Sequence, residues 1–141
     1  MIILPAGVGP MPVEFKLLGL TLLLGIVQIL LAAVVRTRQY GRRWNMGARD
    51  EIMPPLEPLP GRLLRAQANL FETLPIFAAA LLGAAVAGRL GFLTVLGSHL
   101  YFWGRLVYLP LYGIGVPMVR TLVWLVSLVG LLLVIGALLL G

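Results

Sequence analysis

The chain has 141 residues but no cysteine, one histidine and only five acidic residues. The absence of cysteine excludes a disulfide framework, a cysteine nucleophile and thiolate ligation of a metal, so any thiol chemistry must come from a substrate. The single histidine, His99, has no second histidine or acidic cluster with it, and we expect helix packing there and no metal site. Charged residues are also scarce, at 11%, against 60% hydrophobic residues and a mean hydropathy of +1.02. These values are typical of an integral membrane protein.

Four apolar stretches are each long enough to cross the roughly 30 Å hydrocarbon layer of a bilayer. They cover about residues 13–35, 62–88, 92–112 and 118–140. The first has no basic segment before it and no convincing cleavage site, so we expect a retained helix and no signal peptide. The sequence therefore predicts an all-α fold: one domain over residues 1–141, built as an integral membrane four-helix bundle.

Basic residues gather at one connection, which predicts the topology and argues against a nucleic-acid-binding face despite the net charge of +6. Only Lys16 and Arg89 lie near the opposite helix ends. By the positive-inside rule the connection over residues 36–61 is cytoplasmic, and both termini face outward. The basic residues in or beside this connection are Arg36, Arg38, Arg42, Arg43, Arg49 and Arg62.

Two of the predicted helices carry a polar stripe. At about 100° per residue, four residues of the second helix fall within a quarter-turn: Arg62, Arg65, Asn69 and Glu72. On the third helix, the spacing i, i+4, i+7 and i+11 places four more on one face: Tyr101, Arg105, Tyr108 and Tyr112. Ionisable residues inside a membrane helix are costly, and they indicate a functional site.

The remaining two helices add arginines at the same end, since Arg36 closes the first helix and Arg120 opens the fourth. Several guanidinium groups with one carboxylate suit a ligand that is mainly anionic and carries one cationic group. Glutathione has two carboxylates, one ammonium and a thiol. The simpler interpretation is an internal ion pair between Glu72 and Arg65 or Arg105, with the tyrosines as interfacial anchors.

Two segments resemble the membrane-associated proteins in eicosanoid and glutathione metabolism (MAPEG), a family that includes leukotriene C synthase, microsomal prostaglandin E synthase and the microsomal glutathione transferases. The first is RAQANLFETLPIF, with Arg65, Asn69 and Glu72 at the family's spacing. The second, YFWGRLVYLPLYGIGVPMVRTLVW, looks like the family's third-helix tyrosines followed by the arginine that opens the fourth helix. The connection RDEIMPPLEPLPG resembles the bacterial branch, which implies a bacterial inner membrane.

The resemblance implies a homotrimer that holds glutathione between neighbouring subunits near the cytoplasmic side. Arg120 would be the catalytic group, because a guanidinium stabilises the glutathione thiolate. A lipophilic electrophile or hydroperoxide would reach that thiolate from the bilayer. Glu72 would bind the γ-glutamyl ammonium, and Arg62 and Arg105 are further candidates. The implied glutathione-binding residues are Arg36, Arg65, Asn69, Glu72, Tyr108 and Tyr112.

Two alternatives remain open at the level of sequence. A non-catalytic protein of the same fold could bind lipid or a partner protein, because a fold does not by itself prove turnover. A proton-coupled small multidrug transporter would also have four short helices and a buried glutamate. In such transporters, however, the glutamate lies in the first helix. The first apolar stretch of this chain has no acidic residue beyond Glu14 at its outer end.

Overall fold

The computed structural model describes residues 9–141, and the first eight residues, at the terminus predicted to face outward, lie outside the described part. The described residues form helices and no strand, so the prediction of an all-α fold is confirmed. The helices are α1 (Val13–Tyr40), α2 (Arg42–Met46), α3 (Pro58–Val86), α4 (Phe92–Ile114) and α5 (Pro117–Leu140).

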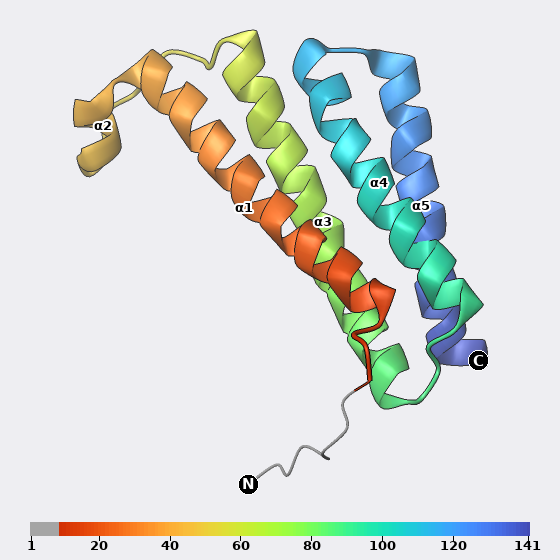
Figure 1. Cartoon of the computed structure of the whole chain (residues 1–141). Helices are drawn as coiled ribbons and strands as arrows, with labels where there is room; N and C mark the ends of the chain where they lie inside the picture. Colours follow the sequence, from red (N-terminus) through yellow and green to blue (C-terminus); the bar gives the residue numbers. More distant parts are fainter. Residues whose placement is uncertain (1–8) are drawn as a thin grey trace, which may run out of the picture.

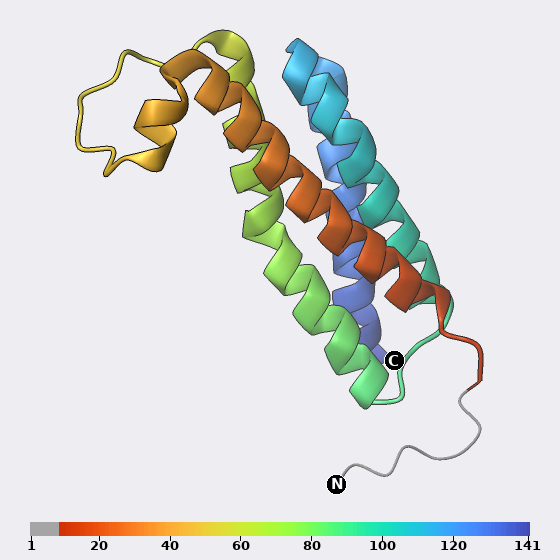
Figure 2. The ribbon, with the colours of Figure 1, turned by 60° about the vertical axis from the view of Figure 1, so that its left-hand side comes forward.

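The four long helices run side by side along most of their length (Figures 1 and 2). The start of α1 and the end of α5 lie at one end of the molecule, and the connections from α1 to α3 and from α4 to α5 lie at the other. The short helix α2 lies beside the end of α1, away from α4 and α5. This arrangement brings the arginine-rich connection and the start of α5 to the same end, as the topology prediction requires.

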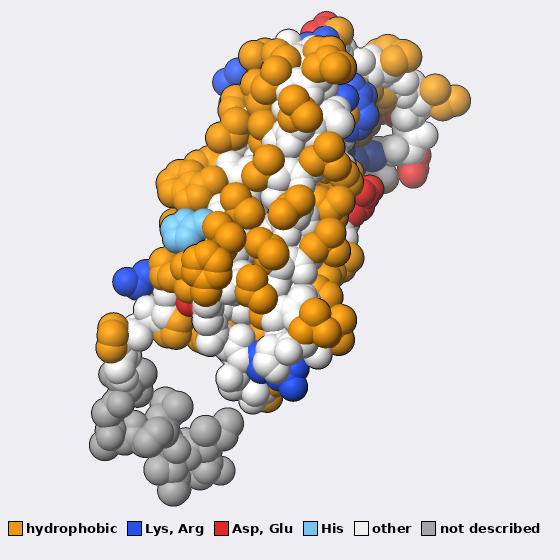
Figure 3. All heavy atoms as spheres, turned by 90° about the vertical axis from the view of Figure 1, so that its right-hand side faces the viewer, with side chains coloured by type: hydrophobic (Ala, Val, Ile, Leu, Met, Phe, Trp, Pro, Cys, Tyr) orange, Lys and Arg blue, Asp and Glu red, His pale blue; other side chains and the backbone are white. Residues whose placement is uncertain are grey.

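Three of the helices, α1, α3 and α5, are long and apolar enough to cross a membrane. Hydrophobic side chains cover most of the face formed by α4 and α5, with lysine and arginine mainly toward its ends (Figure 3). Helix α4 has 23 residues, which is also sufficient length at 1.5 Å per residue, but its polar side chains lower its hydropathy. The chain is therefore an integral membrane protein, and a fourth crossing by α4 stays a prediction.

The helix bounds correct the predicted ranges at the arginine-rich end. Helix α1 continues to Tyr40, beyond residue 35, and stops at Gly41, whose φ of 94° is in the region that favours glycine. Helix α3 begins at Pro58, before residue 62, because a proline in the first turn lacks only an N–H that the helix does not use. Helix α2 was not predicted, and every other helix end lies within two residues of the predicted one.

The connection between α1 and α3 is tied back to the end of α1 by side-chain hydrogen bonds. The Tyr40 hydroxyl donates to the Pro54 carbonyl at 2.5 Å. The Gln39 side chain donates to the Pro55 carbonyl at 3.0 Å and accepts from the Glu57 backbone N–H at 2.8 Å. These bonds satisfy backbone groups of a proline-rich segment that has no regular structure of its own. The segment is therefore anchored where it enters α3.

The closest helix packing is between α4 and α5, where glycines face each other. A Cβ atom built on Gly97 would lie 2.6 Å from the Gly130 carbonyl oxygen, and one on Gly130 would lie 2.5 Å from the Gly97 carbonyl oxygen. Two turns further along α4, a Cβ on Gly104 would lie 2.9 Å from the Ser127 Cβ. Small residues allow this backbone approach, and they determine how α4 and α5 are rotated toward each other.

Candidate functional site

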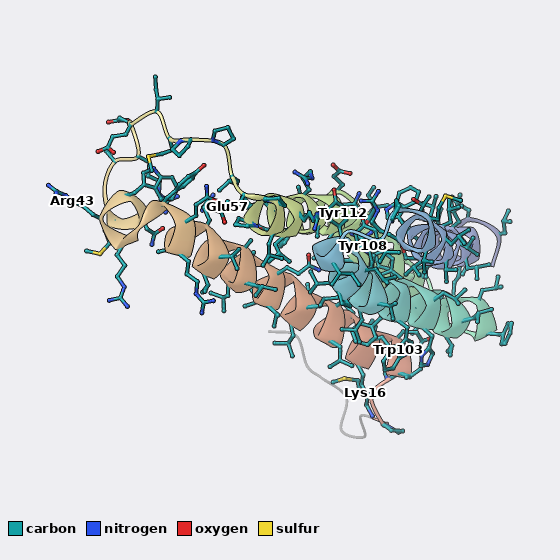
Figure 4. The ribbon with its side chains drawn as sticks, turned by 90° about the horizontal axis from the view of Figure 1, so that it is seen from above. Lys16, Arg43, Glu57, Trp103, Tyr108 and Tyr112 are labelled. Carbon is teal, nitrogen blue, oxygen red and sulfur yellow. The ribbon has the colours of Figure 1, made fainter. Side chains whose placement is uncertain are left out.

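A pocket of about 280 Å³ opens between α3, α4 and α5 near the end where α5 begins. Seen from above, Tyr108 and Tyr112 on α4 lie between α3 and α5 (Figure 4). Five of the predicted site residues line this pocket: Arg65, Asn69, Tyr108, Tyr112 and Arg120. Residues more than fifty positions apart in the sequence therefore share one cavity.

Helical spacing explains why these side chains converge. Asn69 follows Arg65 by four residues on α3, and Tyr112 follows Tyr108 by four on α4, so each pair lies on one face of its helix. Arg120 lies in the first turn of α5, directly after the turn in which Gly115 has a φ of 79°. The reversal at this turn places the start of α5 beside the end of α4.

Tyr112 is in contact with both pocket arginines. Arg65 Nε donates to the Tyr112 hydroxyl at 3.1 Å, and the Arg120 Cζ lies 4.5 Å from the centre of the Tyr112 ring. The Tyr108 and Tyr112 rings meet edge to face with centroids 5.5 Å apart. Cation–π contact with Tyr112 holds Arg120 near Arg65, and no acidic side chain of the described residues lines the pocket with them, so both positive charges face the pocket.

Asn69 accepts two hydrogen bonds on its side-chain oxygen. Arg105 Nη1 donates to Oδ1 at 2.8 Å, and the Trp124 indole Nε1 donates to the same atom at 3.0 Å. Arg105 is only 1% exposed, and its Cζ lies 4.7 Å from the Tyr108 ring centre. Arg105 thus lies behind the pocket wall and does not line the pocket.

The pocket presents hydrogen-bond donors and, among the residues that the structure describes, no carboxylate. Arg65 and Arg120 can only donate, and the Tyr112 hydroxyl, which already accepts from Arg65, has its own proton left to donate. The side-chain oxygen of Asn69 already accepts hydrogen bonds from Arg105 and Trp124, so its NH₂ group is left to donate to a ligand. An environment of this kind suits an anionic ligand rich in oxygen acceptors.

Besides Arg105, three more of the predicted site residues do not line this pocket. Arg36 lies over the Trp44 ring, with its Cζ 5.4 Å from the ring centre. Arg62 donates to the Gly113 carbonyl at 3.5 Å, and Glu72 is exposed on α3. The hydrogen bonds of Arg65 and Arg105 go to Tyr112 and Asn69, so the structure does not support the simpler interpretation of an internal ion pair with Glu72.

Sequence reasoning missed two residues of the pocket, Thr121 and Trp124. Trp124 follows Arg120 by four residues in the segment RTLVW, so the helical spacing could have identified it. No group of histidine and carboxylate residues able to hold a metal occurs within residues 9–141.

The comparison with known families gives a match over most of the chain. The model of the MAPEG family matches residues 17–140, which includes all four long helices except the first turn of α1. The chain belongs to the MAPEG family. Members of this family are membrane proteins with glutathione-related transferase, synthase or isomerase functions in general. A search of curated proteins finds no match to this chain.

MAPEG membership connects the donor-rich pocket to one class of ligand. MAPEG proteins generally use glutathione, and glutathione is an anionic tripeptide rich in oxygen acceptors. The five site residues that line the pocket are among the seven that the resemblance in sequence assigned to glutathione or to its thiolate; the other two, Arg36 and Glu72, do not line it. A pocket suited to an anion is therefore compatible with the ligand that MAPEG proteins generally use.

Proposed function

We propose that this MAPEG protein is a glutathione-dependent membrane transferase or peroxidase that acts on lipophilic electrophiles or hydroperoxides. The observation that carries the proposal is the pocket between α3, α4 and α5, whose wall, as far as residues 9–141 form it, has two guanidinium groups and no carboxylate. A bound anion compensates those charges better than solvent does, because ionic hydrogen bonds are strong in a site of low dielectric constant.

Arg120 is the proposed catalytic group. A thiol with a pKa of about 8.5 is mostly protonated at neutral pH, and an adjacent guanidinium stabilises the thiolate. In conjugation, the thiolate sulfur forms a bond to an electrophilic carbon while the leaving group departs with its electron pair. In peroxide reduction, the thiolate sulfur bonds to one peroxide oxygen as the O–O bond breaks, and the leaving alkoxide takes up a proton to give the alcohol. The thiol of a second glutathione then attacks the sulfenic acid, which gives the disulfide and water. Arg120 acts electrostatically in both reactions, because arginine cannot act as a base.

A homotrimer, which the resemblance in sequence implies, is part of the proposal, and the exposure of Glu72 supports association between subunits. Glu72 lies midway along α3, roughly 21 Å from either end at 1.5 Å per residue, and its side chain is exposed. An exposed carboxylate at that depth would face hydrocarbon, at high cost. A neighbouring subunit would cover it and bring its own Arg36 to the glutathione, while Glu72 binds the γ-glutamyl ammonium. In this proposal the connection 36–61 is cytoplasmic in a bacterial inner membrane.

Calorimetric titration of the detergent-purified protein with reduced glutathione tests the proposal. We expect saturable binding, and we expect Arg65→Gln to weaken it about tenfold or more, since a charged hydrogen bond contributes about 1.5–3 kcal/mol. Arg38→Gln is the matched control, because Arg38 is exposed on α1 and does not line the pocket. If the folded wild-type protein binds no glutathione at millimolar concentration, the proposal is wrong and a non-catalytic protein that binds lipid or a partner becomes the better explanation.

The Glu72→Gln substitution tests the role of the exposed carboxylate. We expect weaker glutathione binding, by about tenfold, with kcat at saturating glutathione largely retained, because the amide loses the charge that pairs with the ammonium. Glu14→Gln serves as the control, since Glu14 lies at the other end of the molecule, where it accepts a hydrogen bond from Thr94. An unchanged dissociation constant in Glu72→Gln would contradict contact between Glu72 and the ligand.

A further inference from the structure

The side-chain amide of Asn69 is held in one orientation by two donors on two different helices. Arg105 Nη1 on α4 and Trp124 Nε1 on α5 lie 2.8 Å and 3.0 Å from Asn69 Oδ1. Neither a guanidinium nor an indole N–H can accept a hydrogen bond. If the amide turned over, its NH₂ group would face two donors and lose both bonds. The oxygen of Asn69 must therefore point into the wall of the pocket.

The consequence for the pocket is that Asn69 offers donors to a ligand. Both lone pairs of Oδ1 are occupied, and Asn69 is half-buried at the pocket wall, so its NH₂ group is the part left for a bound molecule. A ligand must then place an acceptor there, such as a carboxylate or a peptide carbonyl. An asparagine free to turn over would accept either a donor or an acceptor, and the site would discriminate less.

We infer that Trp124 and Arg105 are positioning residues for ligand recognition, which act through the amide of Asn69; this inference rests on the proposed glutathione function. Arg105 is 1% exposed and does not line the pocket, so it acts on the ligand through Asn69 and not by direct contact. Its Nε and Nη2 have no hydrogen-bond partner within residues 9–141, so Asn69 is its one hydrogen-bonding anchor among those residues. Residues that hydrogen-bond to a ligand-binding residue commonly determine its orientation in this way.

A double-mutant cycle tests whether Trp124 acts through Asn69. We expect Trp124→Phe, which keeps an aromatic ring but removes the indole N–H, to raise the dissociation constant of glutathione about tenfold. In the Asn69→Ala background the same change should have an effect below about twofold, because the amide it would orient is gone. The KM for glutathione should rise, with kcat at saturation unchanged. The control is Trp103→Phe, because Trp103 is exposed and its indole donates to His99.

The Asn69→Asp variant provides a second test that does not depend on the folding of Trp124→Phe. A carboxylate accepts from Arg105 and Trp124 at least as well as the amide oxygen, so the thermal midpoint should be no lower than that of the wild type. Its second oxygen, however, presents a negative acceptor to the pocket, and glutathione affinity should fall more than tenfold. A merely structural Asn69 would leave that affinity unchanged.

The outcomes of these experiments distinguish a failure of the positioning role from a failure of the proposed function. If Trp124→Phe has the same effect with and without Asn69, or if Asn69→Asp binds glutathione like the wild type, the positioning role is wrong while the proposed function stands. If the folded wild-type protein itself binds no glutathione, the proposed function fails and the inference fails with it.

Discussion

Replacing Arg120 with alanine is expected to lower turnover by about 100- to 1,000-fold, the range found when one preorganised group that stabilises developing charge is removed. Glutathione affinity should change much less, because Arg65, Asn69 and the two tyrosines still line the pocket. The measurements are kcat with a chromogenic aryl halide and the ultraviolet absorbance of the bound thiolate.

A conservative variant separates charge from shape at this position. Arg120→Lys keeps a positive charge but loses the flat guanidinium whose Cζ lies 4.5 Å from the Tyr112 ring centre. We expect it to retain part of the thiolate signal and more turnover than Arg120→Ala. Turnover in Arg120→Ala equal to that of the wild type would show that another group stabilises the thiolate.

The second large effect concerns the packing of α4 against α5. We expect Gly130→Ala to lower the free energy of unfolding by about 3 kcal/mol, at the upper end of the range for overpacked cores. The added Cβ would lie 2.5 Å from the Gly97 carbonyl oxygen and 2.7 Å from the Tyr101 backbone nitrogen, so both obstacles are backbone atoms that no side-chain rotation can move. Thermal unfolding in detergent, followed by circular dichroism, measures the change.

Gly136→Ala is a matched control on the same helix. A Cβ on Gly136 meets nothing within 4 Å, and alanine is favoured over glycine in a helix by about 1 kcal/mol, so stability should be unchanged or slightly higher. Equal stability of Gly130→Ala and wild type would mean that α4 and α5 separate easily. In that case the relative positions of Tyr112 and Arg120 would not depend on this contact.

The membrane class and much of the site were predictable from local patterns. Apolar runs of sufficient length predict helices wherever the chain must satisfy its own backbone hydrogen bonds in lipid. The four-residue spacing of Arg65 with Asn69, and of Tyr108 with Tyr112, places each pair on one helical face whatever surrounds it. The concentration of arginines in the connection 36–61 predicted the topology of the helices, and this topology places both pairs at the same end of the molecule.

Other features could not be predicted, because they depend on neighbours distant in the sequence. The prolines near residue 58 led to a predicted start of α3 at residue 62, four residues too late. A sequence alone does not show that these prolines lie in the first turn, where the helix does not use their missing N–H groups. Helix α2 is five residues long and has no apolar period of its own. Trp124 was overlooked because an indole in an apolar helix is usually packed against lipid or core, and its partner Asn69 lies 55 positions away.

The sequence by itself determined that this is an all-α membrane protein of the MAPEG family, with polar residues on defined helical faces at one end. Only the tertiary structure decided which of those residues share a pocket. It placed Arg105 behind the wall, Trp124 at the wall, and Arg36, Arg62 and Glu72 elsewhere. The physical reason is that periodicity defines a face within one helix, whereas the rotation of one helix against another follows from packing. Here that rotation is set where Gly97 and Gly130 let two backbones meet.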